Sequence, residues 1–503
     1  MRSQVPTLGL AMIVKNGAQT LRNCLASVQG IVDTITIADT GSTDESVAIA
    51  HEFGATVLSM PWANDYAKAR NAVVDSLETD WILSLDADEA VAEGSADWIR
   101  TAIAEKGVDA YHLQMRNYIS PHVLAPMDQI MLNPGEVPAY APDTVAYVPS
   151  AAMRLFRRDP EIRFVGCIHE MVEYRILELG RPFLPGGITL HHFGWYLTDA
   201  VRGAEKRDRY FQLMGQKIRE MPKDTNSMIR YGYMLFENYG KPDEALAMMK
   251  HAITINPRTP SAWLWTAVIL TKLRRYDDAL LALAQVPASD SRSLYTQLIG
   301  DCHLGLGKLE EAQIAYETAL LTAPFDRLIR SKLGLTEVRL GLKREGLDRI
   351  RAAAEAKPQN ESIDQMLVSA YIAAGQMEEA LVEGELFARK YKRLDAWLEV
   401  VQTHAHRGDW ASAMQSVNSA IEQLPDAIPL HEFHLNAALA LSDWPAASAA
   451  ARRVADLAPS PESLIRLATI LHHIGEQAES QRILILRETA FATLSPDVEA
   501  IPA

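Results

Sequence analysis

The chain has 503 residues, and this length favours two or more domains, each large enough to bury a hydrophobic core of its own. Its formal net charge of −15 argues against general nucleic-acid binding and against a basic membrane-binding surface. Three widely separated cysteines, Cys24, Cys167 and Cys302, form neither a disulfide framework nor a zinc motif, and no apolar run approaches about 18 residues. We therefore expect a soluble protein of the reducing cytoplasm.

Predicted strands and helices alternate from the N-terminus to Leu85. Apolar runs predict strands at 8–14, 34–38, 55–58 and 81–85, and the spacing of apolar residues predicts helices between them, one of them at 66–77. This alternation predicts an α/β fold with a mostly parallel, Rossmann-like sheet and helices on both faces. Ligands of such sheets bind beyond the carboxyl ends of the strands. Asp39 and the segment 86–88 both follow strands, so we expect them to meet at one edge of the sheet.

Three carboxylates, Asp86, Asp88 and Glu89, follow the strand predicted at 81–85. Asp86 and Asp88 are two positions apart, so they point to the same side of an extended segment. Mg²⁺ and Mn²⁺ prefer oxygen ligands, commonly one or two protein carboxylates together with substrate phosphates. The pair therefore suits a divalent cation. The alternative interpretation is a strand that runs into a solvated acidic turn.

Four segments, in this order and spacing, resemble family 2 glycosyltransferases of the GT-A fold. They are Met12–Asn16, Ala38–Asp44, Ala69–Asn71 and Asp86–Glu89. The resemblance implies a nucleotide-diphosphate sugar donor, such as a UDP-sugar, and Mn²⁺ or Mg²⁺ as cofactor. It implies that Asp88 binds the cation, that Asp39 faces the base, and that Asp86 faces the ribose or the cation and its water.

The same resemblance implies that Val14, Arg70 and Asn71 border the nucleotide pocket. For Arg70 and Asn71 the alternative interpretations are an arginine on a helix surface and an asparagine that caps a helix. Residues 116–150 are rich in proline and poor in periodicity. We predict that they form a flap on the acceptor side, and a disordered insertion is the alternative.

Two later segments, Met153–Arg158 and Phe164–Glu170, resemble the second half of the same glycosyltransferase group. Sugar transfer with displacement of a nucleoside diphosphate needs a base that takes the acceptor's proton. Glu170 is the candidate base. His169 is the second candidate, or it orients the acceptor. The alternative is a histidine–glutamate pair on the surface at a strand end.

The segment 191–195 follows a predicted strand, and in the related group a histidine–aromatic–glycine–aromatic element lies at this point, which matches His192 onward. A neutral imidazole could complete the coordination of the cation or contact the diphosphate. A structural histidine is the alternative. Lys206, Arg207 and Arg209 follow on a predicted helix, where they could screen phosphates or form a solvated charged face.

From about residue 223 the strand signals end and a repeated unit begins. Its copies start at Gly240, Arg274, Gly307, Gly341, Gly375, Gly408, Ser442 and Gly475, so the steps are 34, 33, 34, 34, 33, 34 and 33 residues. This period, with a small residue five positions after each start, matches tetratricopeptide repeats. Eight helix–turn–helix units would stack into an all-α solenoid. Such a solenoid binds extended peptides or mediates assembly.

We predict a catalytic domain at 1–215, repeats at 216–490 and a tail at 491–503. The predicted function is inverting, metal-dependent transfer of a sugar to a peptide or protein acceptor that the repeats hold. One alternative is a lipid-linked or polysaccharide acceptor, with the repeats serving homodimerisation. Another is a scaffold without catalytic activity.

Overall fold

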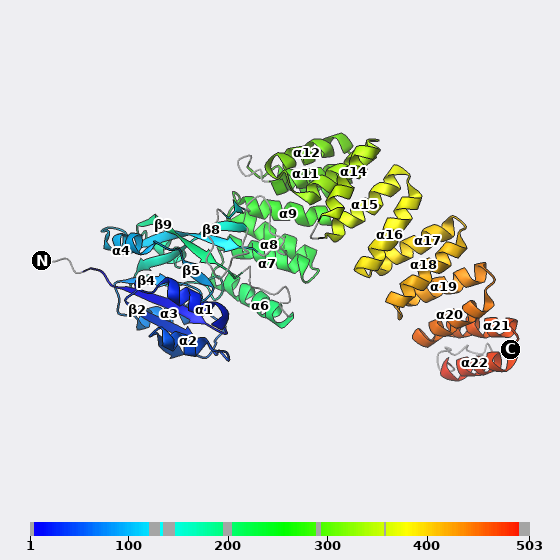
Figure 1. The fold of residues 1–503 in the computed structure, drawn as a ribbon, viewed down its shortest axis with the longest axis horizontal. Helices are drawn as coiled ribbons and strands as arrows, with labels where there is room; N and C mark the ends of the chain where they lie inside the picture. Colours follow the sequence, from blue (N-terminus) through cyan, green and yellow to red (C-terminus); the bar gives the residue numbers. More distant parts are fainter. Residues whose placement is uncertain are drawn as a thin grey trace, which may run out of the picture. The chain divides into compact units, whose positions relative to one another are not determined.

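The computed structural model describes residues 5–119, 131–133, 146–194, 204–287, 293–356 and 359–491. The chain divides into two compact units. One unit contains residues 1–306 and 321–323, and the other contains residues 307–320 and 324–503. A sheet with flanking helices occupies the N-terminal part of the first unit, and the described residues that follow it are mostly helical (Figure 1).

The described residues of the N-terminal part form a sheet with the strand order β3-β2-β1-β4-β8-β6-β9-β5, and β7 pairs with β8. The strands are β1 Leu8–Val14, β2 Thr34–Asp39, β3 Thr56–Ser59, β4 Trp81–Ser84, β5 Glu89–Val91, β6 Ala110–Tyr118, β7 Met131–Leu132, β8 Ala146–Arg157 and β9 Phe183–His192. Strands β1 to β4 pair in parallel, as predicted. Strand β8 runs antiparallel between β4 and β6, so the complete sheet is mixed.

Helices cover both faces of this sheet, because alternate residues of its strands are buried on opposite sides. The helices are α1 Ala18–Ser27, α2 Ser46–Glu52, α3 Tyr66–Ser76, α4 Ala96–Ala104 and α5 Glu173–Glu178. Leu10 and Met12 of β1 share one hydrophobic cluster with Leu21 of α1. Ala11, between them in sequence, belongs to a second cluster with Val73 of α3. The prediction of a sheet with helices on both faces is confirmed.

Part of the predicted 116–150 flap is strand. Residues 116–118 belong to β6 and residues 146–150 to β8, where Asn117 pairs with Val148 and Tyr118 with Tyr147. The partner strands are about 30 residues apart in sequence, so local periodicity could not reveal the pairing. Residues 120–130 and 134–145, which carry the rest of the predicted flap, lie outside the described residues.

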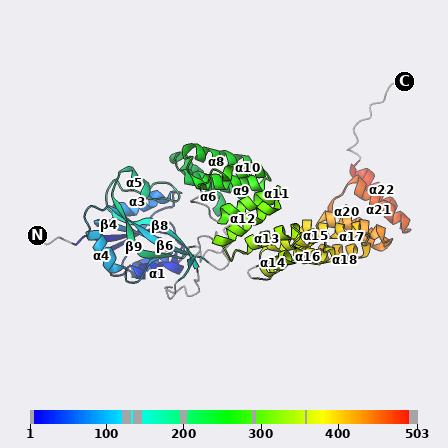
Figure 2. The same cartoon turned by 90° about the horizontal axis from the view of Figure 1, so that it is seen from above.

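The remaining described helices follow the predicted repeat period. They are α6 Ala204–Glu220, α7 Thr225–Glu237, α8 Pro242–Ile255, α9 Pro260–Lys272, α10 Tyr276–Leu283, α11 Ser293–Gly305, α12 Leu309–Thr322, α13 Arg327–Arg339, α14 Lys343–Glu355, α15 Glu361–Ala374, α16 Met377–Tyr391, α17 Leu394–His406, α18 Trp410–Gln423, α19 Ile428–Ala440, α20 Trp444–Leu457, α21 Pro461–His473 and α22 Gln477–Phe491. In the first unit α7 packs on α8 and α9 on α10, and α13–α22 stack successively in the second unit (Figure 2). None of the described helices is long and apolar enough to cross a membrane.

Every predicted turn position between the paired helices has a positive φ. Six are glycines, with φ from 61° at Gly240 to 96° at Gly341, and the other two are Arg274 at 58° and Ser442 at 57°. The small residue five positions later is buried in each repeat; for example, Ala245 and Ala413 are both 0% exposed. The repeat register predicted from the sequence is therefore confirmed. The predicted boundary at residue 215 lies inside α6.

We predict that Ser442→Gly stabilises the protein by about 1 kcal/mol, because an L-residue with a side chain is strained in the left-handed region and glycine is not. The reverse change at the equivalent turn, Gly408→Ser, should destabilise by a similar amount, since Gly408 has φ 77°. Denaturant unfolding of the full chain, followed by circular dichroism, measures both. Equal midpoints for the two variants would contradict the prediction.

Candidate active site

Arg70 joins two other predicted site residues, Asp86 and Glu170, at the carboxyl end of β4. It lies on α3, whose N-terminus is capped by Asp65, and it is only 5% exposed. Its Nη2 donates to Asp86 Oδ1, its Nε donates to Glu170 Oε1 at 2.5 Å, and its Nη1 donates to Ser84 Oγ at 3.3 Å. Asp86 and Glu170 are far apart in sequence, and one guanidinium holds both at the same point.

Arg154 on β8 supplies a second cation at this point. Its Nη2 donates to Asp86 Oδ2 at 2.9 Å and to Glu89 Oε1 at 2.5 Å. The other oxygen of Glu89 accepts from the backbone N–H of Asp86 at 3.0 Å, and the Glu89 side chain is fully buried. Arg70, Asp86, Glu89, Arg154 and Glu170 thus form one network, here termed the charge cluster.

The charge cluster shifts its own carboxylates in opposite directions. Burial alone would raise the pKa of Asp86, but Arg70 and Arg154 together hold that pKa well below its ordinary value. Burial raises the pKa of Glu89, and the negative charge of Asp86 raises it further, against the effect of Arg154. Asp86 is therefore ionised at any physiological pH, and Glu89 takes a proton more easily than Asp86 does.

Asp88 and His192 face each other beside the charge cluster. Asp88 Oδ2 lies 3.7 Å from His192 Nε2, and their side chains are 35% and 19% exposed. His192 Nδ1 is 2.7 Å from Asn117 Oδ1, and the amide nitrogen of Asn117 donates to Val148 O at 2.9 Å and to Ser150 Oγ at 2.8 Å. Since the amide oxygen of Asn117 can only accept, Nδ1 carries a proton, and Nε2 is the ring nitrogen that faces Asp88.

This pair fits a divalent cation only with help from other ligands. A carboxylate oxygen and an imidazole nitrogen are suitable donors for Mn²⁺ or Mg²⁺, and the hydrogen bond from His192 to Asn117 orients the ring as metal-bound histidines require. The described residues contain no group of three or more His, Cys, Asp and Glu side chains placed to hold a metal. Phosphate oxygens of a substrate would have to complete the coordination.

Asp86, which is predicted to face the ribose or the cation and its water, belongs to the charge cluster. Both of its carboxylate oxygens are bonded to arginines, Oδ1 to Arg70 and Oδ2 to Arg154. Of the two carboxylates in Asp86-Ala87-Asp88, that of Asp86 therefore belongs to the charge cluster, and that of Asp88 lies next to His192. Gly194 makes room for that pair, because a Cβ there would lie 2.6 Å from Asp88 Oδ2 and 2.7 Å from His192 Nε2.

Glu170 and His169, the two candidate bases, point to different neighbours. Among the described residues, only Oε1 of Glu170 is bonded, and the side chain is 9% exposed. His169 Nε2 is 2.5 Å from the hydroxyl of Tyr210 on α6. Removal of water from the ring, together with the charges of Arg230 and Lys217, lowers the pKa of His169 to about 4. His169 is therefore bonded to α6 through the Tyr210 hydroxyl, and its role as second candidate base or as the residue that orients the acceptor stays a prediction.

Three residues predicted to border the nucleotide pocket also have defined partners. Val14 ends β1 opposite Asp39 of β2, as expected for one edge of the sheet. The carboxylate of Asp39 accepts from the backbone N–H of Ser42 at 3.1 Å, which shapes the loop after β2. Asn71 exchanges two hydrogen bonds of 2.9 Å with the backbone of Phe164, so it holds α3 to the segment that leads to Glu170.

Sequence reasoning assigned no role to Arg154, Glu89 or Asn117. Glu89 lies in the segment Asp86–Glu89 and Arg154 in the segment Met153–Arg158. Both segments had already been identified in the sequence, and their membership was the available signal. Asn117 had none, because it lies in the stretch interpreted as a flap. Of the basic residues predicted to screen phosphates, Arg207 and Arg209 are exposed on α6. The side chain of Lys206 and the whole of Trp195 lie outside the described residues.

Three models of known protein families match parts of the chain. The family model described as glycosyl transferase family 2 matches residues 10–163, and two tetratricopeptide repeat models match residues 239–301 and 297–326. A thermophilic tetratricopeptide repeat protein of Thermus thermophilus has 22% identity and a TM-score of 0.32, over 35% of this chain and 97% of that chain.

Three curated proteins are similar to parts of the chain. A TPR repeat-containing protein of Synechococcus elongatus is 31% identical over 46% of this chain and 52% of its own. An uncharacterized glycosyltransferase of Rickettsia felis is 34% identical over 24% of this chain and 44% of its own. The prophage-derived glycosyltransferase SunS of Bacillus subtilis is 24% identical over 50% of this chain and 54% of its own. The chain thus spans about half the length of the curated relatives that it matches.

We predict that Arg154→Met lowers the free energy of unfolding by about 3–5 kcal/mol, because it leaves the buried carboxylate of Glu89 without its cation. The double change Arg154→Met with Glu89→Gln should recover most of the loss, since no unpaired charge remains. Denaturant unfolding of the two variants compares these free energies. Equal losses in both would show that the methylene packing of Arg154, rather than its charge, stabilises the site.

Proposed function

We propose that this chain, which carries a family 2 glycosyltransferase domain followed by tetratricopeptide repeats, is an inverting, divalent-metal-dependent glycosyltransferase. Its donor would be a nucleotide-diphosphate sugar such as a UDP-sugar, and its acceptor a peptide or protein held by the repeats. The observation that carries the proposal is the charge cluster with the Asp88–His192 pair at the carboxyl ends of parallel strands, where sheets of this type bind ligands.

Glu170 is the base in this proposal. Its Oε1 is fixed by Arg70 at 2.5 Å, and Oε2 has no partner among the described residues, so Oε2 can accept the proton of the acceptor nucleophile. The nucleophile then forms a bond to the anomeric carbon as the bond from that carbon to the diphosphate breaks. The electron pair of that bond leaves with the nucleoside diphosphate, and a single displacement inverts the anomeric configuration.

Asp88 and His192 would hold the divalent cation, and Asn117 would keep His192 in the ligating tautomer. When bound, the cation would neutralise the negative charge that develops on the departing diphosphate. Arg70 and Arg154 keep Asp86 ionised and oriented toward the same point. Asp39 at the end of β2 would face the nucleotide base, and Val14 would border it.

The repeats support a peptide or protein acceptor. In the second unit, a pocket between α15, α16 and α17 is lined by apolar side chains such as Val368, Ile372 and Leu381 and by the polar side chains of Glu399 and Thr403. An extended peptide presents apolar side chains and free backbone groups together, which such a mixed lining can accommodate. The proposed location of the enzyme is the cytoplasm, where nucleotide sugars would serve as donors.

We predict that Asp88→Asn abolishes metal-dependent donor hydrolysis without unfolding the protein, because the variant keeps the shape of the side chain and loses its charge. A thermal-shift screen with UDP-glucose, UDP-N-acetylglucosamine and GDP-mannose, each with Mn²⁺ or Mg²⁺, first identifies the donor. Asp97→Asn, at an exposed position in the first turn of α4, is the matched control. Full activity of Asp88→Asn in chelator-treated buffer would refute the cation site.

We predict that Glu170→Gln lowers turnover about 10²–10⁴-fold and leaves donor affinity nearly unchanged, since the amide keeps a hydrogen-bonding oxygen but cannot take the proton. Donor hydrolysis and calorimetric titration with the selected nucleotide sugar measure the two quantities. Glu178→Gln, on the exposed side of α5, is the control. An equal loss of donor affinity would place Glu170 in the donor pocket, and a product with retained configuration would exclude single displacement.

A further inference from the structure

The loop that carries Glu170 is bonded to α6 at three points. This loop, residues 166–170, is here termed the catalytic loop. Cys167 Sγ donates to the carbonyl oxygen of Leu213 at 3.3 Å. His169 Nε2 is 2.5 Å from the Tyr210 hydroxyl, and its carbonyl oxygen accepts from Lys217 Nζ at 3.0 Å. The three α6 partners are spaced by three and four residues, so they lie on one face of that helix.

The backbone of the catalytic loop depends on these contacts. Gly166 has φ 98° and His169 has φ 48°, so two of five residues are in the left-handed region. For His169, which has a side chain, this conformation is unfavourable unless surrounding contacts hold it. Backbone hydrogen bonds between Val165 and Met171, of 3.1 and 3.2 Å, close the base of the loop. Its tip, next to Glu170, is held by α6.

Lys217 is the most deeply buried of the α6 contacts. It is 2% exposed, and its Nζ lies 3.2 Å from Asp224 Oδ2. Asp224 is itself the cap of α7, where it accepts from the backbone N–H of Ser227 at 3.1 Å, and it also accepts from the Tyr174 hydroxyl at 3.1 Å. A buried ammonium group needs such a partner, because an unpaired charge in this position is strongly unfavourable.

The catalytic loop is shaped to receive this lysine. A Cβ at Gly166 would lie 3.0 Å from Lys217 Cε and 3.4 Å from its Cδ, closer than ordinary van der Waals contact for the first of these atoms. Lys217 therefore crosses the loop at Gly166 before it reaches the carbonyl oxygen of His169. Glycine at 166 satisfies both the positive φ and this close approach.

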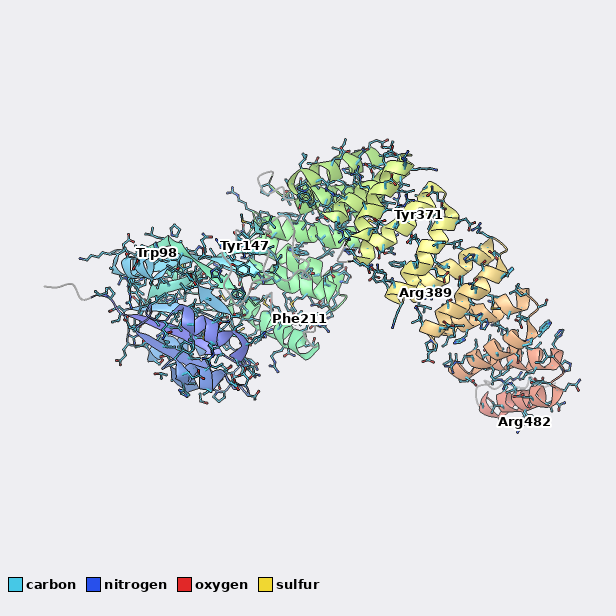
Figure 3. All side chains as sticks on the ribbon, in the orientation of Figure 1. Trp98, Tyr147, Phe211, Tyr371, Arg389 and Arg482 are labelled. Atoms are coloured by element: carbon cyan, nitrogen blue, oxygen red, sulfur yellow. The ribbon has the colours of Figure 1, made fainter. Side chains whose placement is uncertain are left out.

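A neighbouring side of α6 packs on the first repeat. Phe211 stacks on Tyr231 of α7, with ring centroids 4.4 Å apart and an angle of 11° between the planes (Figure 3 labels Phe211). Ile218 joins the hydrophobic cluster of Met228 and Met249, which belong to α7 and α8. Helix α6 thus contacts the catalytic loop on one side and the repeat helices on a neighbouring side.

We propose that α6 positions the catalytic loop, with Lys217 as the principal positioning residue, and this inference rests on the proposed function of Glu170. Lys217 links the carbonyl oxygen of His169, one residue before Glu170, to the capping carboxylate of the first repeat helix. The placement of the base therefore depends on the junction with the repeats. The repeat region serves the chemical step in addition to any role in acceptor binding.

The test is the full-length double variant Lys217→Met with Asp224→Asn. This variant leaves no unpaired buried charge, and asparagine remains a good cap for α7. The turnover number for hydrolysis of the nucleotide sugar selected by the screen should fall about 10- to 100-fold, because a displacement of the base by about 1 Å has an effect of this size. Donor affinity, measured by calorimetry, should change less than about twofold, since the donor residues are untouched.

Tyr174→Phe is the matched control, because it removes a hydrogen bond to the same carboxylate without changing the catalytic loop. Its melting temperature should fall while turnover stays as in the wild type. Lys217→Arg, which keeps the charge and the donor group, should restore part of the turnover. Tyr210→Phe removes another α6 contact to the loop without burying a charge, and it should also lower turnover at unchanged donor affinity.

The outcomes separate the two proposals. A wild-type protein that hydrolyses none of the nucleotide sugars refutes the proposed function. An active wild type, with Tyr210→Phe and the folded double variant equally active, refutes the positioning role. If the double variant does not fold, Tyr210→Phe decides alone, because full turnover in that variant contradicts the proposal.

Discussion

The interaction on which the rest of the site depends is the double contact of Arg70 with Asp86 and Glu170. One buried guanidinium binds Asp86, which follows β4, and Glu170, which lies on a loop 100 residues beyond Arg70. Each carboxylate alone would be unfavourable in this position because of the loss of hydration. The planar guanidinium can bond both in fixed directions, which a lysine could not do. The two halves of the site therefore come together only when both are folded.

Such a network contributes little net stability, because the attraction between its charges offsets the cost of burying them. The network instead fixes the positions and orientations of its side chains. Arg154 lies on β8, which pairs antiparallel with β4. It binds both Asp86 and the fully buried Glu89, and so connects these two carboxylates. The result is a set of oriented carboxylates next to the Asp88–His192 pair. This preorganisation is what a site for charged substrates requires.

Local patterns in the sequence predicted the parts of the fold that depend on local order. The strands up to β4, the sheet edge with Asp39 and Asp88, and the period of the repeats all follow from residue spacing. The path of β8 does not, since it depends on pairing with strands distant in sequence. For the same reason the sequence could not identify Arg154 as the partner of Asp86 and Glu89, or Asn117 as the partner of His192. Contacts of His169 with α6 likewise became visible only in three dimensions.

The predicted boundary at residue 215 suggested a simple division between catalysis and binding, and the contacts of α6 argue for a different division. Helix α6 crosses that position, and its last turns hold both the catalytic loop and the cap of α7. The first compact unit accordingly extends to residue 306 and includes the first repeats. Fusion of the repeats to the catalytic domain through a shared buried ion pair thus makes the first repeats part of the structural support of the proposed base.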